Sequence, residues 1–136
     1  MPIDSQDPVV GPQTTSTGLA PSVAGLLSYV LGPITGILFL VLEKENRFVR
    51  FHAAQSVAVG VALVIPSILL TVLSTILAFI PILGWIVAAL AGLGFSLLTF
   101  ILWLLLMYRA FQGDEWEAPI VGKYARQYAR PATPVV

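Results

Sequence analysis

The chain carries very little charge. Seven basic and seven acidic residues make up 10% of its 136 residues, against roughly 25% in ordinary globular proteins. No charged residue falls in 8–42 or in 51–108, so helices formed there would lack the polar face that a water-soluble helix needs. This distribution excludes a soluble enzyme, a nucleic-acid-binding protein and a disordered linker. It indicates an integral membrane protein.

Cysteine is absent and histidine occurs once, at His52. The absence of cysteine excludes disulfides, thiol redox chemistry and thiol lipidation. A metal site would have to combine His52 with Glu43 or Glu45, and we expect neither a metal nor a cofactor. No ionisable residue lies inside the long apolar stretches, where proton relays and charged-substrate transporters place them. Catalytic motifs are also absent, so we expect no enzyme activity.

Three uncharged stretches are long enough to cross a hydrocarbon core of ~30 Å. We therefore predict an all-α fold with three transmembrane helices and interfacial amphipathic helices. Gly32-Pro33 should kink the first span, because Pro33 cannot donate to the carbonyl of Tyr29. The predicted parts are a polar tail at 1–22, spans at 23–42, 56–79 and 85–108, an interfacial helix at 43–55, and an interfacial amphipathic segment at 109–136.

Residues 43–55 place aromatic and polar side chains on one helical face. His52 on this face has two interpretations: a proton carrier or metal ligand, or an interfacial histidine that bonds Gln55 or a carbonyl. The tryptophans Trp85 and Trp103 lie 18 residues apart, which is ~27 Å along a helix, and suit opposite interfaces. The predicted interfacial residues are Arg47, Arg50, His52, Gln55, Trp85 and Trp103.

The basic residues predict the orientation. With two crossings between 53 and 108, all seven basic residues lie on one side of the membrane, as the positive-inside rule requires. Three spans then place the N-terminus outside and the C-terminus in the cytoplasm, in the inner or plasma membrane of a cell.

Small residues recur at helical spacing and would let helices approach closely. Two interpretations remain open: these faces pack the three spans into one bundle, or at least one of them docks another chain. The candidate packing residues are Gly32, Gly36, Gly84, Ala88, Gly92 and Ser96.

Three blocks resemble a known family: LSYVLGPITGILF (27–39), LEKENRFVRFHAAQS (42–56) and YRAFQG (108–113). They are similar to small prokaryotic multi-pass membrane proteins of uncharacterised function. That family is distantly similar to the twenty-kilodalton component of the chloroplast inner-envelope import translocon. The resemblance implies a multi-pass helical protein and a link to protein translocation, although the plastid proteins have four spans and we predict three.

These observations lead to a functional hypothesis. We expect a structural or assembly subunit that contacts the lipid bilayer and packs against other membrane proteins or copies of itself, without nucleic acid. The alternative is an oligomeric pore or protein-translocation component, suggested by the hydroxyl residues Ser67, Thr71 and Thr75 and by the resemblance. An enzyme that acts on lipid headgroups through His52 and Glu43 or Glu45 is a third possibility.

Overall fold

The computed structural model describes residues 15–129, and this part of the chain is helical and contains no strand. The predicted all-α fold is therefore confirmed. Most of the predicted tail at 1–22, and residues 130–136 of the predicted C-terminal segment, lie outside the described residues. The helices are α1 (Pro21–Val30), α2 (Pro33–Leu42), α3 (Arg47–Leu77), α4 (Leu83–Phe111) and α5 (Gly122–Ala129).

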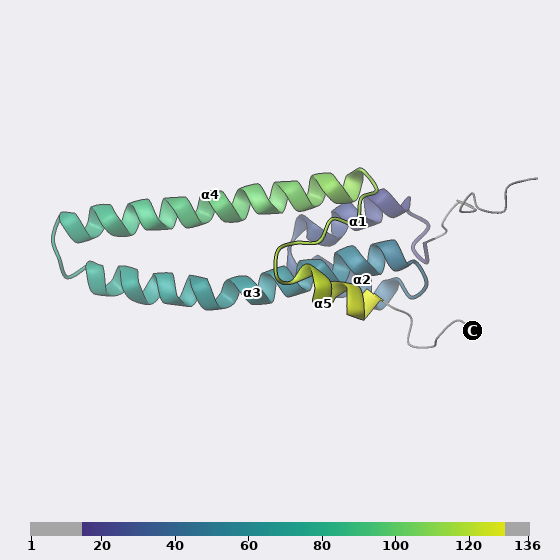
Figure 1. The fold of residues 1–136 in the computed structure, drawn as a ribbon, viewed down its shortest axis with the longest axis horizontal. Helices are drawn as coiled ribbons and strands as arrows, with labels where there is room; N and C mark the ends of the chain where they lie inside the picture. Colours follow the sequence, from purple (N-terminus) through teal and green to yellow (C-terminus); the bar gives the residue numbers. More distant parts are fainter. Residues whose placement is uncertain (1–14, 130–136) are drawn as a thin grey trace, which may run out of the picture.

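Helices α3 and α4 form a long antiparallel hairpin (Figure 1). They have 31 and 29 residues, or about 46 Å and 43 Å of helix, and both are long and apolar enough to cross a membrane. Asn46 starts α3, because its side chain accepts a hydrogen bond from the amide of Val49 at 3.1 Å. The predicted span at 85–108 falls within α4, and the one at 56–79 lies in α3 except for its last two residues, since α3 ends at Leu77.

The turn between α3 and α4 depends on Gly84. A β-carbon at Gly84 would overlap the carbonyl oxygen of Leu77. Ile82 immediately before α4 has a φ of +64°, a conformation that a β-branched residue rarely adopts. Gly84 therefore serves the tight connection within this chain, whereas the sequence suggested only a place in a helix-packing face.

The predicted first span at 23–42 is wrong as a single membrane-crossing helix. Two 10-residue helices, α1 and α2, take its place, and each is about 15 Å long, half of a ~30 Å hydrocarbon core. Gly32 has a φ of +60°, and Pro33 starts α2 at a position where its missing N–H is not needed. The pair reverses the chain direction, where the sequence predicted a kink.

Two hydrogen bonds, one at each end, establish that α1 and α2 are antiparallel arms. The hydroxyl of Ser56 donates to the carbonyl of Gly32 at the tip, at 2.8 Å. At the other end of the arms, the amide of Ser16 donates to the carboxylate of Glu43, at 2.8 Å. Residue 16 therefore lies beside the loop that starts α3. The sequence predicted the N-terminus on the opposite side of the membrane from this loop. The described residues instead bring the start of the chain beside the loop, and the orientation in the membrane stays a prediction.

The two predicted interfacial segments also differ from the structure. The predicted interfacial helix at 43–55 starts only at Arg47, and it continues into the next span as the first part of α3, because no residue that breaks a helix lies between Asn46 and Ser56. In the C-terminal segment as far as residue 129, only α5 is helical beyond α4. It packs on α3 with Ala125 and Ala129 buried against Phe51 and Ala54.

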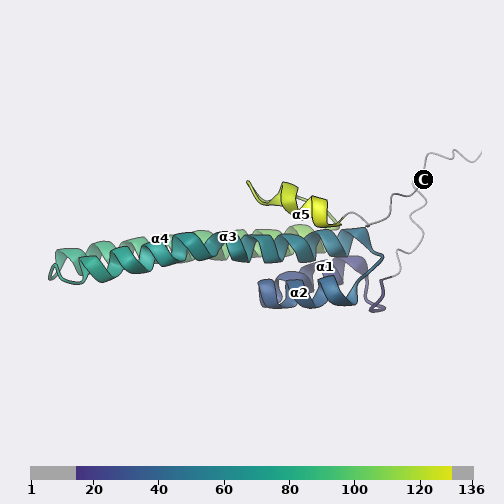
Figure 2. The same cartoon turned by 90° about the horizontal axis from the view of Figure 1, so that it is seen from below.

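The short helices surround one end of the α3–α4 hairpin. Helices α1 and α2 cover one face of it, and α5 lies on the other (Figure 2). The three clusters of buried apolar side chains all lie at this end. We call this part the head (residues 15–60 and 103–129) and the remainder the distal hairpin (residues 61–102). The distal hairpin is largely exposed, as expected for helices that face lipid.

Candidate functional site: a buried polar network in the head

His52 is at the centre of the head and is completely buried. Its Nε2 lies 3.0 Å from the carbonyl oxygen of Asp114, and its Nδ1 lies 2.9 Å from the hydroxyl of Tyr29. Because a carbonyl only accepts, Nε2 carries the proton and Nδ1 accepts from Tyr29. The rings of Tyr29, Phe48 and Phe51 contact the imidazole edge-on. Both ring nitrogens are thus used inside the chain, which agrees with the interpretation of His52 as a residue that bonds a carbonyl.

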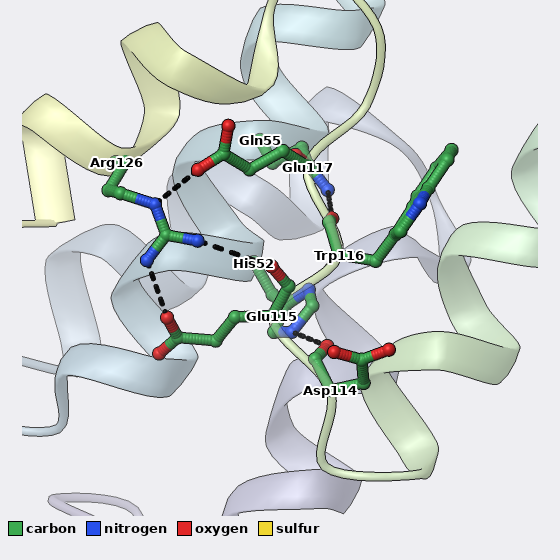
Figure 3. Close-up of polar contacts among 7 residues, drawn as sticks. All are labelled: His52, Gln55, Asp114, Glu115, Trp116, Glu117 and Arg126. Carbon is green, nitrogen blue, oxygen red and sulfur yellow. Dashed lines mark hydrogen bonds and ion pairs between the residues drawn. The ribbon is translucent and has the colours of Figure 1, made fainter.

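Gln55, one turn further along α3, connects three parts of the chain. Its amide nitrogen donates to the Tyr29 hydroxyl and to the carbonyl of Trp116, both at 3.0 Å. Its amide oxygen accepts from the backbone amide of Ala118, at 2.8 Å. His52 and Gln55 together hold the loop that follows α4 (Figure 3). All of these bonds tie elements together, and they leave no group of Gln55 free for a ligand.

Arg126 of α5 reaches back to the same loop. Its guanidinium donates to the carboxylate of Glu117 and, at 2.8 Å, to that of Glu115 (Figure 3). It also lies 4.8 Å from the centroid of the Phe51 ring, a cation–π contact. Hydrogen bonding to Glu117 raises the pKa of Arg126, burial opposes this rise, and Glu115 adds to it. The charge of Arg126 therefore fastens α5 to the loop.

A second polar cluster surrounds Glu43, between α2 and α3. The carboxylate is buried and accepts hydrogen bonds from the amides of Ser16 and Asn46, at 2.8 and 3.0 Å, and from the Ser16 hydroxyl, at 3.0 Å. Burial alone would raise the pKa of Glu43, but the bonds from Asn46, Ser16 and Glu45 lower it below its ordinary value. The ionised carboxylate thus fastens the start of α3 to residue 16.

Acid should therefore weaken the head through Glu43. A carboxylate whose pKa is lowered by folding stabilises the fold above its ordinary pKa of 4.5, and this gain is lost as the pH falls through the lower folded-state value. We expect thermal unfolding of wild type, followed by tryptophan fluorescence in mild detergent, to lose more stability on acidification than Glu43→Gln. The exposed neighbour provides the control, Glu45→Gln, which should follow wild type. Parallel pH profiles for wild type and Glu43→Gln would contradict this role.

The predicted packing residues divide into two groups. Gly32 and Gly84 form turns, and Gly36 lies against α3, where a β-carbon would approach the carbonyl oxygen of Ala53 to 2.8 Å. On α4, Ala88 is half-buried and Ser96 is exposed, and a β-carbon at Gly92 would meet nothing within 4 Å. The first three residues therefore pack the chain itself, and the neighbourhood of Gly92 is open.

The predicted interfacial residues also have different surroundings. Arg47 is exposed, whereas Arg50 is half-buried and donates to the carbonyls of Leu40 and Glu43. Trp85 is 60% exposed and donates to the carbonyl of Ala78. Trp103 is half-buried, and its indole N–H donates to the carbonyl of Tyr29. This carbonyl is the one that Pro33 leaves without a helical partner.

Sequence reasoning missed Tyr29, Arg126 and the carbonyls of the loop at 114–118. The partners of Gln55 in this loop lie 61 and 63 residues away, so helical periodicity contains no signal for them. Among residues 15–129, every buried polar side-chain atom has a hydrogen-bond partner. The same residues contain no group of three histidine or acidic side chains that could hold a metal ion. The buried polar groups of the described head thus bond to one another and to the backbone.

Comparisons with known proteins agree with a membrane protein. A family model described as the magnetosome magnetite crystal formation protein family matches residues 14–125. A UPF0132 membrane protein of Methanocaldococcus jannaschii is 45% identical over 116 residues, 85% of this chain and 94% of the relative. One from Archaeoglobus fulgidus is 43% identical over 106 residues, 78% of this chain and 92% of the relative.

These matches confirm the expected prokaryotic membrane family, and they support a membrane location. The distant similarity to a chloroplast translocon component stays a prediction. No solved structure matches the chain. Because the family model covers most of the sequence and the archaeal relatives align along nearly their whole length, the chain belongs to the magnetosome magnetite crystal formation protein family.

Proposed function

We propose that this protein is a non-enzymatic structural or assembly subunit, which packs against another membrane protein through its distal hairpin. The observation that carries the proposal is that other helices cover only one end of the α3–α4 hairpin. Helices α1 and α2 cover the hairpin only as far as Gly60, which touches Pro33. Beyond that level no other described helix packs on α3 or α4 (Figure 2).

An apolar groove begins where this covering ends. It has a volume of about 580 Å³ and lies between α3 and α4, next to the α1–α2 turn at Gly32 and Pro33. Its walls include the small residues Gly60, Ser96 and Thr99. Small side chains let a helix backbone approach closely, and close packing drives helix association in lipid. A helix of another membrane protein would fill this groove and extend the layer that α1 and α2 begin.

The hydroxyl residues of α3 do not favour the alternative of a pore. The hydroxyls of Ser67, Thr71 and Thr75 donate to carbonyls of their own helix, at 2.7 to 2.8 Å. Their donors are therefore satisfied within α3, so these side chains can face lipid without an unpaired donor. The description of the family concerns magnetite crystal formation in magnetosomes, whereas the archaeal relatives are named only as membrane proteins. A subunit that organises other membrane proteins is compatible with both.

The orientation follows from the basic residues as a second part of the proposal. The six described basic residues, Lys44, Arg47, Arg50, Arg109, Lys123 and Arg126, all lie in the head. The positive-inside rule then assigns the charged end of the head to the cytoplasmic side and the α3–α4 turn to the outside of the inner or plasma membrane. Helices α1 and α2 would enter the membrane from the cytoplasmic side and return to it as a re-entrant pair. Because Ser16 lies beside Glu43, both ends of the described chain are cytoplasmic in this orientation.

Two glycines of α4 provide a matched test of the packing proposal. A β-carbon at Gly92 or at Gly94 would meet nothing within 4 Å, so leucine at either position should leave the isolated chain folded. The two positions point about 200° apart on the helix, and Gly92 is one turn from Ser96 at the groove. We expect Gly92→Leu to shift the protein to a smaller species in native electrophoresis of mild-detergent extracts. Gly94→Leu should migrate like wild type, and a monomeric species for all three proteins would contradict the proposal.

A further inference from the structure

A second apolar groove runs along the outer edge of α3, on the side away from α4. Its volume is about 470 Å³. Helix α2 borders it on one face of the hairpin and α5 on the other (Figure 2). The floor of the groove consists of small and β-branched side chains of α3, and two tyrosines of α5 form part of its wall. The lining residues are Leu40, Ala54, Val57, Ala58, Val61, Ala62, Val121, Tyr124 and Tyr128.

A basic residue, Arg50, lies next to the end of this groove nearest the start of α3. Arg50 lies one helical turn before Ala54, and its guanidinium is 3.2 Å from the carbonyl of Leu40, a residue that lines the groove. Within residues 15–129, Arg50 forms no ion pair, in contrast to Arg109 and Arg126. It is nevertheless half-buried. Within the described residues only its Nη1 donates, to the carbonyls of Leu40 and Glu43, so its remaining N–H donors are available to an anion such as a phosphate.

Along α3 the groove changes from polar to apolar, as a lipid monolayer does from its headgroups to its acyl chains. Arg50 marks the polar end, Tyr124 and Tyr128 have the amphipathic character of interfacial residues, and the floor as far as Ala62 is apolar. Arg50 and Ala62 are separated by about 18 Å along the helix. This distance reaches from the headgroup level into the hydrocarbon of one leaflet, whose full core is ~30 Å thick for two leaflets.

We propose that this groove binds one phospholipid with an anionic headgroup. Its phosphate lies beside Arg50, and one acyl chain occupies the apolar floor from Val57 to Ala62. The acyl chain supplies van der Waals contacts to the side chains of the floor, which an empty groove would leave without partners. The phosphate supplies a negative charge that pairs with Arg50. Lys123 is exposed at the neighbouring surface of α5 and adds to the positive potential that attracts anionic lipids. This site lies on the opposite side of α3 from the proposed protein-packing groove.

The test is native mass spectrometry of the full chain, released from nanodiscs that contain equal amounts of phosphatidylglycerol and phosphatidylcholine. We expect wild type to retain one phosphatidylglycerol. Ala62→Phe should fill the exposed floor of the groove and abolish this retention, and Val61→Trp provides a second filling variant, since Val61 is 64% exposed. Ala89→Phe is the control, because Ala89 is exposed on α4 and lines neither groove.

The charge is tested separately. Arg50→Gln should lower the preference for phosphatidylglycerol over phosphatidylcholine about fivefold, the effect expected for one basic residue near an anionic surface. Arg47→Gln removes an exposed charge from the same helical turn and should change the preference less. Equal retention of both lipids by wild type, or retention by both filling variants as strong as that of Ala89→Phe, would overturn the proposal. A co-purifying protein displaced by Ala62→Phe would likewise overturn it, in favour of a protein-binding site.

Discussion

Replacing Gln55 with leucine will release the loop after α4 from the head and will lower the free energy of unfolding by about 3 kcal/mol or more. Three partners lose their hydrogen bonds in this variant: the Tyr29 hydroxyl, the Trp116 carbonyl and the Ala118 amide. Buried groups without partners cost about 1–3 kcal/mol each. Leucine has a similar size but cannot satisfy any of them. The effect should therefore greatly exceed that of an ordinary polar-to-apolar substitution.

The loss of these hydrogen bonds should first free the loop and α5, before the rest of the fold unfolds. Residues 112–121 and α5 are held to α3 mainly by Gln55, His52 and the small apolar cluster around Phe51. We expect hydrogen exchange of the amides in 112–129 to accelerate strongly in Gln55→Leu, while α4 remains protected. The control is Gln127→Leu, because Gln127 is exposed on α5. If the two variants exchange and unfold alike, Gln55 does not hold the loop after α4 to α3.

The sequence predicted the long helices well because their signal is local. The stretch at 85–108 lacks charge, and α4 extends it only to Leu83 and Phe111. The polar side chains of 43–55 predict an interfacial helix that leads into the span at 56–79. The backbone is continuous there, since a change of polarity along a helix does not break its hydrogen bonds. Polarity reports the environment of a helix, and its ends depend on caps such as Asn46.

The error at Gly32-Pro33 has a different cause. A proline after a glycine is compatible with a kink or with a complete reversal, and contacts far along the chain decide between them. Here Ser56 bonds the Gly32 carbonyl, and Trp103 bonds the Tyr29 carbonyl. The basic residues could not reveal the reversal either. Residues 1–42 contain no lysine or arginine, so the charge rule says nothing about the side on which this part begins.

The polar network was predictable only in part. The shared face of His52 and Gln55 follows from their spacing on one helix. Their partners at Asp114, Trp116 and Ala118 are backbone groups, which every residue has and which therefore leave no trace in composition. Glu43 was visible as a carboxylate, but its role depends on the amides of Ser16 and Asn46 that converge on it.

The central claim is that α1 and α2 enter the membrane and return to the same side, so that the two ends of the described chain share one side. The absence of cysteine allows a direct test with single-cysteine variants and a membrane-impermeant maleimide. Leu19, Gln112 and Phe79 are suitable positions, because all three are exposed. Leu19 precedes α1, Gln112 follows α4, and Phe79 lies in the α3–α4 turn.

Labelling of intact cells before and after permeabilisation then distinguishes the two topologies. With the re-entrant pair, Leu19→Cys and Gln112→Cys should both react only after permeabilisation, and Phe79→Cys should react in intact cells. A single membrane-crossing helix at 23–42 would instead expose Leu19→Cys in intact cells while Gln112→Cys stays protected. That result would contradict the fold of the head and, with it, the proposed orientation.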